Sequence, residues 1–207
     1  YFWVYYLLMA GKNFNPKEEK TFVMIKPDGV RKGLIGEIIR RFEQRDLKVV
    51  ALKMFKPTYS QIDDHYPKEM AWIKRLGEKT LNTYEKFGYD PIKEIGTTDP
   101  EEIGQQVRSW LIDYMTSAPL VQMVVQGVHA VEMVRKICGA TMPYQADMGT
   151  IRGDFSADSP ALANKEKRAV MNLVHASETS EEADHEIAHW FGETPIYEYK
   201  RFGIDWE

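Results

Sequence analysis

Cysteine is almost missing from this sequence of 207 residues, which contains only Cys138. A disulfide within the chain and a zinc site built on several cysteines are therefore excluded. A lone thiol is typical of a reducing compartment, so we expect a cytoplasmic location. Cys138 follows Val134 and Ile137 at helical spacing, which favours a small buried core residue over a nucleophile.

The sequence also lacks a large excess of charge and a long hydrophobic run. The net charge is -4, so we expect no nucleic-acid partner. The apolar residues 1–9 are fewer than the ~20 that cross a bilayer, and no basic segment precedes them. We therefore expect no membrane partner, and we treat residues 1–20 as an N-terminal extension outside the fold.

The common phosphate-binding loops are absent, since the sequence contains neither G-x-x-x-x-G-K-[ST] nor G-x-G-x-x-G. A phosphate site in this chain must therefore be assembled from side chains of several segments. The remaining composition, 43% hydrophobic and 28% charged, is ordinary for a globular domain that buries a core.

The alternation of expected strands and helices predicts an α/β (α+β) protein with a sheet covered by helices, and a ferredoxin-like antiparallel sheet is one such fold. A turn is expected at residues 27–29 because proline and glycine occur there together. Strands are expected at residues 21–26, 47–55, 120–125 and 172–174, and helices at residues 35–42, 128–137 and 179–191. Residues 67–106 are rich in glycine and charge, and we expect a helical insertion within one domain that spans residues 21–207.

The segment 172–178 places His175 at the expected end of a strand, just before a helix that Thr179 or Ser180 can cap. Helix N-termini favour anions, and a neutral imidazole at such a place is a competent nucleophile toward phosphorus. The alternative is a capped strand-to-helix junction with a partly buried histidine.

Three cations are further candidates for binding phosphate. Arg152 can bind phosphate oxygens through two N–H groups, or it can form an ion pair with Asp154 that holds a loop. Lys26 ends a buried strand, where its charged side chain either binds a ligand or extends into solvent. Arg135 lies in the last turn of a helix, where it can also offset the helix dipole.

Together these segments closely resemble the nucleoside diphosphate kinases, in the order typical of that family and from about residue 21 to residue 190. The motifs are M-I-K-P-D-G-V at 24–30, H-Y at 65–66, R-x-x-x-G-A-T-x-P at 135–143, G-T-I-R-G-D-F at 149–155 and N-L-V-H-A-S-E at 172–178.

The resemblance implies that His175 accepts the γ-phosphate of one nucleotide and passes it to a second one, with ping-pong kinetics. Glu186 would orient the imidazole, and Ser177 would support Glu186. By the same resemblance, the phosphates would be bound by Lys26, Arg135, Thr141 and Arg152, the sugar hydroxyl by Asn172, and the transferred group would lie near Tyr66.

The resemblance also implies the ligands and the assembly. Nucleoside tri- and diphosphates would be the substrates, and Mg²⁺ would be held by their phosphates, with no metal site made by the protein alone. Bases would be bound by stacking, which predicts broad tolerance among them. A homo-oligomer, either tetramer or hexamer, is expected.

The insertion is the main departure from the family pattern. About forty residues separate His65-Tyr66 from Tyr114, and counting back from Tyr114 puts Val107 where the family has a base-stacking phenylalanine. Leu111 follows one helical turn later. An aromatic residue of the insertion can replace this phenylalanine, and the sequence does not choose among them. We expect the insertion near the nucleotide entrance, as a lid or an assembly surface.

A zinc peptidase is a rival interpretation, because His185, Glu186 and His189 match H-E-x-x-H. The match extends to Gly192, but Pro195 stands where the longer pattern needs a third histidine. A non-catalytic nucleotide-binding or scaffold protein is another alternative. The retained histidine and its expected partners argue against it.

Overall fold

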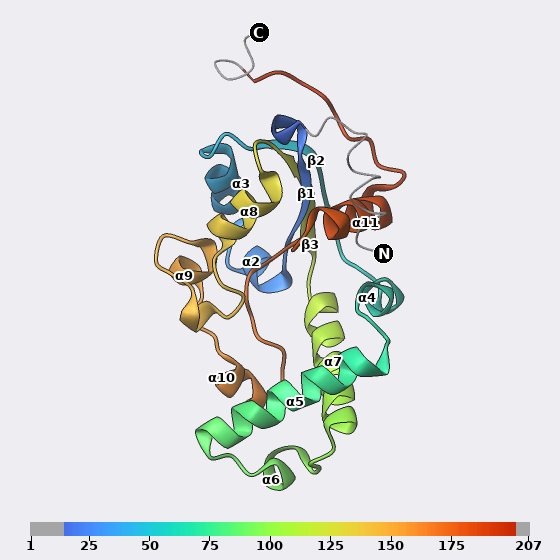
Figure 1. Ribbon diagram of the computed structural model, residues 1–207, viewed down its shortest axis with the longest axis vertical. Coiled ribbons are helices and arrows are strands. Elements are labelled where there is room, and N and C mark those ends of the chain that lie inside the picture. The colour runs from blue at the N-terminus through green and yellow to red at the C-terminus, as the bar shows by residue number, and fades with distance from the viewer. Residues whose placement is uncertain (1–14, 202–207) are drawn as a thin grey trace, which may run out of the picture.

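The computed structural model describes residues 15–201 and contains one four-stranded antiparallel sheet (Figure 1). The strand order β2-β3-β1-β4 and the helices that cover the sheet confirm the α+β, ferredoxin-like expectation. The strands are β1 (Lys20–Ile25), β2 (Lys48–Phe55), β3 (Leu120–Gln126) and β4 (Val174–Ala176).

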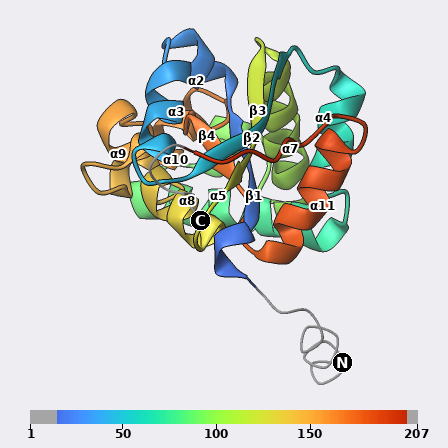
Figure 2. The ribbon, with the colours of Figure 1, turned by 90° about the horizontal axis from the view of Figure 1, so that it is seen from above.

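Helices cover both faces of the sheet, with α3 and α8 on one side and α4, α7 and α11 on the other (Figure 2). The α-helices are α2 (Pro27–Arg31), α3 (Ile35–Glu43), α4 (Tyr59–His65), α5 (Met70–Phe87), α6 (Pro91–Ile95), α7 (Pro100–Thr116), α8 (Ala130–Cys138), α9 (Ile151–Phe155), α10 (Pro160–Lys165) and α11 (Ser180–Phe191). Two short 3₁₀ helices are η1 (Pro16–Glu18) and η2 (Pro143–Gln145).

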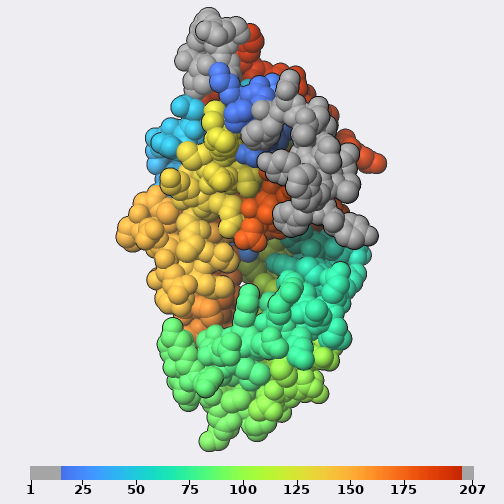
Figure 3. All heavy atoms as spheres, viewed as in Figure 1, coloured from blue at the N-terminus to red at the C-terminus, as the bar shows by residue number. Residues whose placement is uncertain are grey.

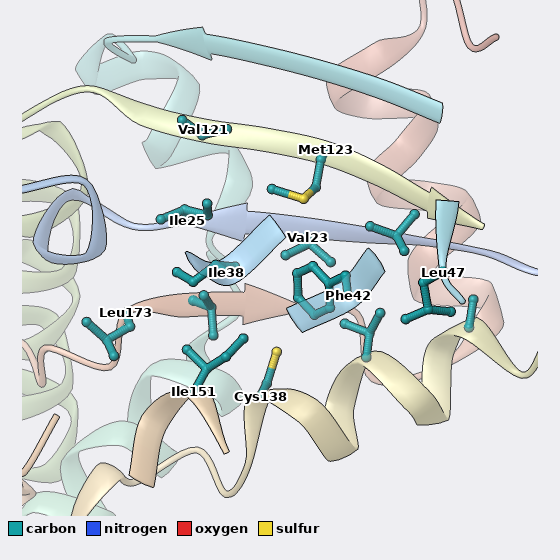
Figure 4. Close-up of a cluster of buried hydrophobic side chains, with 14 residues drawn as sticks. Val23, Ile25, Ile38, Phe42, Leu47, Val121, Met123, Cys138, Ile151 and Leu173 are labelled. Carbon is teal, nitrogen blue, oxygen red and sulfur yellow. The ribbon is translucent and has the colours of Figure 1, made fainter. Parts of the chain in front are cut away.

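Alternation along the central strands builds two separate cores. Val23 and Ile25 of β1 pack toward α3 and α8, as the close-up in Figure 4 shows, whereas Phe22 and Met24 pack toward α7 and α11. This is the period of two expected for a strand that is buried on both faces. Cys138 lies in the first core, 1% exposed, and its burial raises the pKa of the thiol to about 11. It is therefore a core residue, as its spacing suggested.

Two local expectations differ from the structure. Residues 27–29 do not form an isolated turn, because Pro27 begins the short helix α2 with its fixed φ. Strand β4 starts two residues later than expected, at Val174, because Leu173 has a φ of 66° and cannot continue an extended strand. His175 therefore lies inside β4, paired with Met24 of β1, and not after the strand.

The long middle segment is helical, as expected, and its two long helices meet at very short range. A Cβ atom on Gly77 of α5 would lie 1.8 Å from the carbonyl oxygen of Pro100, at the start of α7. A Cβ atom on Gly104 of α7 would lie 2.0 Å from the carbonyl oxygen of Ile73. Only glycine permits this approach of two backbones, so the pair fixes how α5 crosses α7 (Figure 1).

Both ends of the described chain pack against the sheet. Lys20 pairs with Gln126, and the N–H of His129 donates to the carbonyl of Pro16, so residues 16–20 belong to the packed structure. After α11, the N–H of Tyr197 donates to the carbonyl of Val50 on the outer strand β2. The apolar residues 1–9, on which the membrane expectation was based, lie outside the described residues. Between residues 15 and 201, none of the helices combines the length and apolarity needed to cross a membrane.

The glycine crossing predicts a stability effect that depends on position. Gly77→Ala forces the backbones of α5 and α7 apart, and we expect the free energy of unfolding to fall by about 1–3 kcal/mol, as for other overpacked sites. Gly36→Ala is the matched control, because a Cβ atom there meets nothing within 4 Å. Urea unfolding measures both variants, and equal stability for the two would contradict the crossing.

Candidate active site

The candidate active site begins in a cavity of about 310 Å³ where β1 ends beside β4. Pairing of Met24 with His175 brings these two strands together at this point. The cavity is lined by six of the residues predicted from the sequence, namely Lys26, Arg135, Thr141, Arg152, Asn172 and His175. We call it the inner cavity. Four cationic or nucleophilic side chains at one small site are what a polyphosphate requires.

A second cavity of about 610 Å³ opens from the first, and we call it the outer cavity. Lys26, Thr141, Asn172 and His175 border both. The outer cavity continues past Tyr66 and Val107 to α5 and α10, and Figure 3 shows the surface hollowed between these segments. The two cavities together form one continuous site of the size that a nucleotide needs.

The imidazole of His175 is held in place by a hydrogen bond at one of its two nitrogens. Its Nε2 lies 2.6 Å from Oε1 of Glu186, whose Oε2 accepts a hydrogen bond of 2.7 Å from the hydroxyl of Ser177. Burial by itself raises the pKa of Glu186, but the hydrogen bonds from His175 and Ser177 more than offset it, so this pKa lies below its ordinary value. An ionised Glu186 keeps the proton on Nε2, which leaves the lone pair on Nδ1.

His65 is a site residue to which the sequence analysis gave no role, although it belongs to the His65-Tyr66 motif. Its ring lies edge-on to the ring of His175, with 5.7 Å between the two centroids. The centroid of the Trp190 ring lies 5.5 Å from that of His65. Burial, joined by the neighbouring His175, lowers the pKa of His65 to about 4. The ring is therefore neutral at pH 7 and packs beside His175 without adding charge. The neighbouring Tyr66 hydroxyl has a raised pKa because it is buried, so it remains a proton donor.

The ammonium group of Lys26 is hydrogen-bonded to a side-chain amide and not to a carboxylate. Its Nζ donates to Oδ1 of Asn172 at 2.7 Å, and Nδ2 of Asn172 donates to the carbonyl of Thr141. Burial, with help from the charge of Arg152, lowers the pKa of Lys26 to about 8, although Asp28 opposes this change. A lysine near its pKa at physiological pH gains its full charge when an anion binds beside it.

Arg152 acts first as a structural clamp. Its guanidinium donates to three backbone carbonyls, those of Gly139, Asn172 and Val174. The pair of Arg152 with Asp154 that the sequence left open does not form, because Asp154 pairs with Arg41 at 2.6 Å. Arg152 therefore joins the loop after α8 to the segment before His175, and two of its five N–H groups are left for a ligand.

Arg135 stands at the outer side of the inner cavity. Its guanidinium lies 3.3 Å from Glu178, and both side chains are largely exposed. Exposed ion pairs contribute little to stability, so this one exchanges readily for an incoming anion.

Asp28 is a second residue whose role the sequence did not indicate. Its buried carboxylate accepts a hydrogen bond of 2.5 Å from the hydroxyl of Tyr114 and one of 3.1 Å from the N–H of Leu173. The Asp-Gly pair at 28–29 suggested a turn, and nothing in the pattern indicated that α7 and the loop before β4 meet there.

Metal ligands within the described residues fall into one group of three, His65, His175 and Glu186, whose ligand atoms lie within 4.8 Å of one another. Two nitrogens and one carboxylate suit zinc, whereas Mg²⁺ prefers oxygen ligands in an octahedron. This group does not fit Mg²⁺, and His175 and Glu186 already bond to each other.

The zinc-peptidase interpretation of the H-E-x-x-H motif on α11 does not agree with the contacts of its glutamate. The carboxylate of Glu186 is taken by His175 and Ser177. The rings of His185 and His189 stack with their centroids 6.4 Å apart and border the outer cavity.

Comparison with known sequences is consistent with this geometry. A model of the family described as nucleoside diphosphate kinase matches residues 19–73 and 99–196. The nucleoside diphosphate kinase of Pyrobaculum aerophilum is 51% identical over 180 residues, which cover 87% of this chain and 98% of that protein. The enzyme of the same description from Pyrococcus furiosus is 42% identical over 91% of each chain.

Solved structures agree with the sequence comparison. A crystal structure of an NDP kinase from Pyrobaculum aerophilum has a TM-score of 0.83 at 49% identity, covering 87% of this chain and 100% of that one. A transition-state mimic of nucleoside-diphosphate kinase from Borrelia burgdorferi, with bound vanadate and ADP, has a TM-score of 0.70 at 35% identity. It covers 91% of this chain and 95% of its own.

The lowered pKa of Lys26 predicts how ADP affinity depends on pH. Lys26 is charged below about pH 8 and loses its charge as the pH rises further. Calorimetry should therefore show that ADP binding weakens between about pH 8 and pH 10. In Lys26→Gln this decline should be absent, and binding at pH 7 should be roughly 10- to 150-fold weaker, the worth of a hydrogen bond to a charged group. An unchanged decline in Lys26→Gln would refute the assignment.

Proposed function

The chain belongs to the nucleoside diphosphate kinase family of phosphotransferases, and we propose that its phosphoryl transfer passes through a phosphohistidine on His175. The observation that carries this proposal is the hydrogen bond between Nε2 of His175 and Glu186. It fixes the ring and leaves Nδ1 as the nucleophilic nitrogen at the junction of the inner and outer cavities.

In the first step, the lone pair of Nδ1 attacks the γ-phosphorus of a nucleoside triphosphate. The bond from that phosphorus to the bridging oxygen breaks, and the nucleoside diphosphate leaves with the electron pair. The positive charge that develops on the imidazole is stabilised by the carboxylate of Glu186, which Ser177 holds in place. In the second step, an oxygen of another diphosphate attacks the phosphohistidine, and Nδ1 leaves. One site then serves both nucleotides, which requires ping-pong kinetics.

The remaining site residues act by positioning and charge, which supply most of the catalysis in phosphoryl transfer. Lys26, Arg135 and Arg152, with Thr141, bind the phosphate oxygens in the inner cavity. The Tyr66 hydroxyl, which stays protonated, lies near the transferred group. Asn172 contacts the sugar hydroxyl with the hydrogen-bonding capacity that Lys26 and the Thr141 carbonyl leave over.

We further propose that Mg²⁺ is the divalent cation of the reaction and is held by the nucleotide's phosphates. By the family resemblance, the enzyme is a homo-oligomer, tetramer or hexamer, and it uses no nucleic acid. The single buried Cys138 fits a reducing cytoplasm.

The nucleophile is tested by incubating the protein with γ-labelled ATP and Mg²⁺ in the absence of an acceptor. We expect an acid-labile label on the wild-type chain that added GDP releases as labelled GTP. His175→Ala should carry no label, because the attacking nitrogen is gone. His189→Ala, which also alters the wall of the outer cavity, should be labelled like the wild type. Label that survives in His175→Ala, or a wild type that is never labelled, would refute the phosphohistidine.

A further inference from the structure

Helix α5 turns one face, from Trp72 to Thr83, toward the outer cavity. The residues on this face are Trp72, Leu76, Lys79, Thr80 and Thr83. Their spacing of three and four residues is that of a single helical stripe. The family model does not match residues 74–98, which carry most of this wall, whereas Trp72 falls just inside the matched segment 19–73. The wall is therefore a surface of the outer cavity that lies largely outside the part of the chain matched by the family model.

Trp72 is the aromatic residue of α5 that reaches the cavity. Its ring is only partly buried and lies beside that of Tyr66, with 6.2 Å between centroids and 28° between planes. Val107 and Leu111 of α7 border the same cavity and offer only aliphatic surface. The cavity thus lacks an aromatic platform at Val107, where the resemblance expected one, and has an aromatic ring on α5.

Opposite α5, the wall of the outer cavity is formed by α10, which also packs against α5. Asn164 of α10 borders the cavity and is only 8% exposed. Within residues 15–201, its side-chain amide makes no hydrogen bond, whereas the neighbouring Arg168 is paired with Asp158 and Glu166. The amide of Asn164 is not among the fully buried polar atoms without a partner, so it opens to the cavity, where its donor and acceptor are available to a ligand.

We propose that Trp72 and Asn164 bind the base of the nucleotide in the outer cavity. This inference rests on the proposed function, which places the phosphates in the inner cavity. A nucleotide held there extends past Thr141 and Asn172, which border both cavities, into the space between α5 and α10. The ring of Trp72 covers one face of the base, and the amide of Asn164 bonds to its polar edge.

This pair of residues binds any base with little discrimination. Every base has a π face, so stacking tolerates changes of base. A side-chain amide has both a donor and an acceptor, and it can therefore pair with the edge of adenine or of guanine. These two contacts therefore add affinity for the base without restricting the broad range of bases that a nucleoside diphosphate kinase accepts.

The part of α5 that carries Trp72 is tied to α7 on both sides of that residue. Arg108 of α7 pairs with Asp63 at 2.7 Å and also donates to the carbonyl oxygens of Tyr66 and Pro67, which directly precede α5. The crossing of Gly77 over α7 holds the same helix further along. A preorganised ring loses little conformational entropy when a base binds, so more of the stacking energy appears as affinity.

The test compares the binding of Mg-ADP with that of inorganic pyrophosphate, which fills the inner cavity but has no base. We expect Trp72→Ala to raise the Kd for Mg-ADP roughly 5- to 150-fold, the usual worth of one stacked base. Trp72→Phe should restore most of this affinity. Asn164→Leu should raise the Kd roughly 2- to 10-fold, the worth of one neutral hydrogen bond. Binding of pyrophosphate should be unchanged in all three variants.

Phe87→Ala is the matched control, because Phe87 is an exposed aromatic residue of α5 outside the cavity. It should bind both ligands like the wild type. The proposal is overturned if Trp72→Ala binds Mg-ADP normally, or if it loses ADP and pyrophosphate equally, since the latter would mean a general structural role. A wild type that binds ADP but forms no phosphohistidine would refute the proposed function and leave the base contact standing.

Discussion

The buried carboxylate of Asp28 is the constraint on which the geometry of the site depends. A carboxylate inside a protein needs donors, and this one receives them from Tyr114 of α7 and from the N–H of Leu173. Leu173 is thereby held in a left-handed conformation that a leucine rarely adopts. The strand after it can only begin at Val174, and this start sets the register that places His175 opposite Met24. One side chain of α2 thus fixes both the loop and the position of the proposed nucleophile.

The sequence predicted the layout of the sheet and selected six residues that the structure brings together around one cavity, but it did not predict this constraint. Short apolar runs located three of the strands to within about a residue, because β1 and β3 are buried on both faces and so read as continuous hydrophobic segments. The same criterion misplaced β4, because the pattern Asn-Leu-Val looks extended while the φ of Leu173 depends on a contact with Asp28 from a distant part of the chain. Motifs identify Lys26 and Glu186 well because their chemistry is unusual at those positions. Asp28 has an ordinary structural task, and Asp-Gly suggests only a turn.

The sequence predicted part of the outer cavity, where the base of the nucleotide is proposed to bind. Counting residues put Val107 at the outer cavity, and the structure agrees on that location. The choice of an aromatic residue in the insertion depends on how α5 is rotated about its own axis, which no local pattern contains. That rotation follows from two glycines, Gly77 and Gly104, whose importance becomes visible only when the helices are placed together. Spacing therefore predicted where a platform was missing, and tertiary packing decided which residue can supply it.

The two ends of the site are under different physical demands, and this explains why one departs from the family pattern and the other does not. In the proposed reaction, negative charge moves at the phosphate end, so Lys26, Arg152 and His175 would have to be placed accurately for the transition state. Contacts to the base are the same before and during transfer, and such uniform binding changes the apparent affinity but not the chemical step. The proposed base contact needs only a flat ring and one amide, so helices such as α5 and α10 can supply it without matching an exact geometry. The phosphate end has less freedom, because Arg152 donates to the backbone carbonyls of Asn172 and Val174 beside His175, and Lys26 donates to the side chain of Asn172.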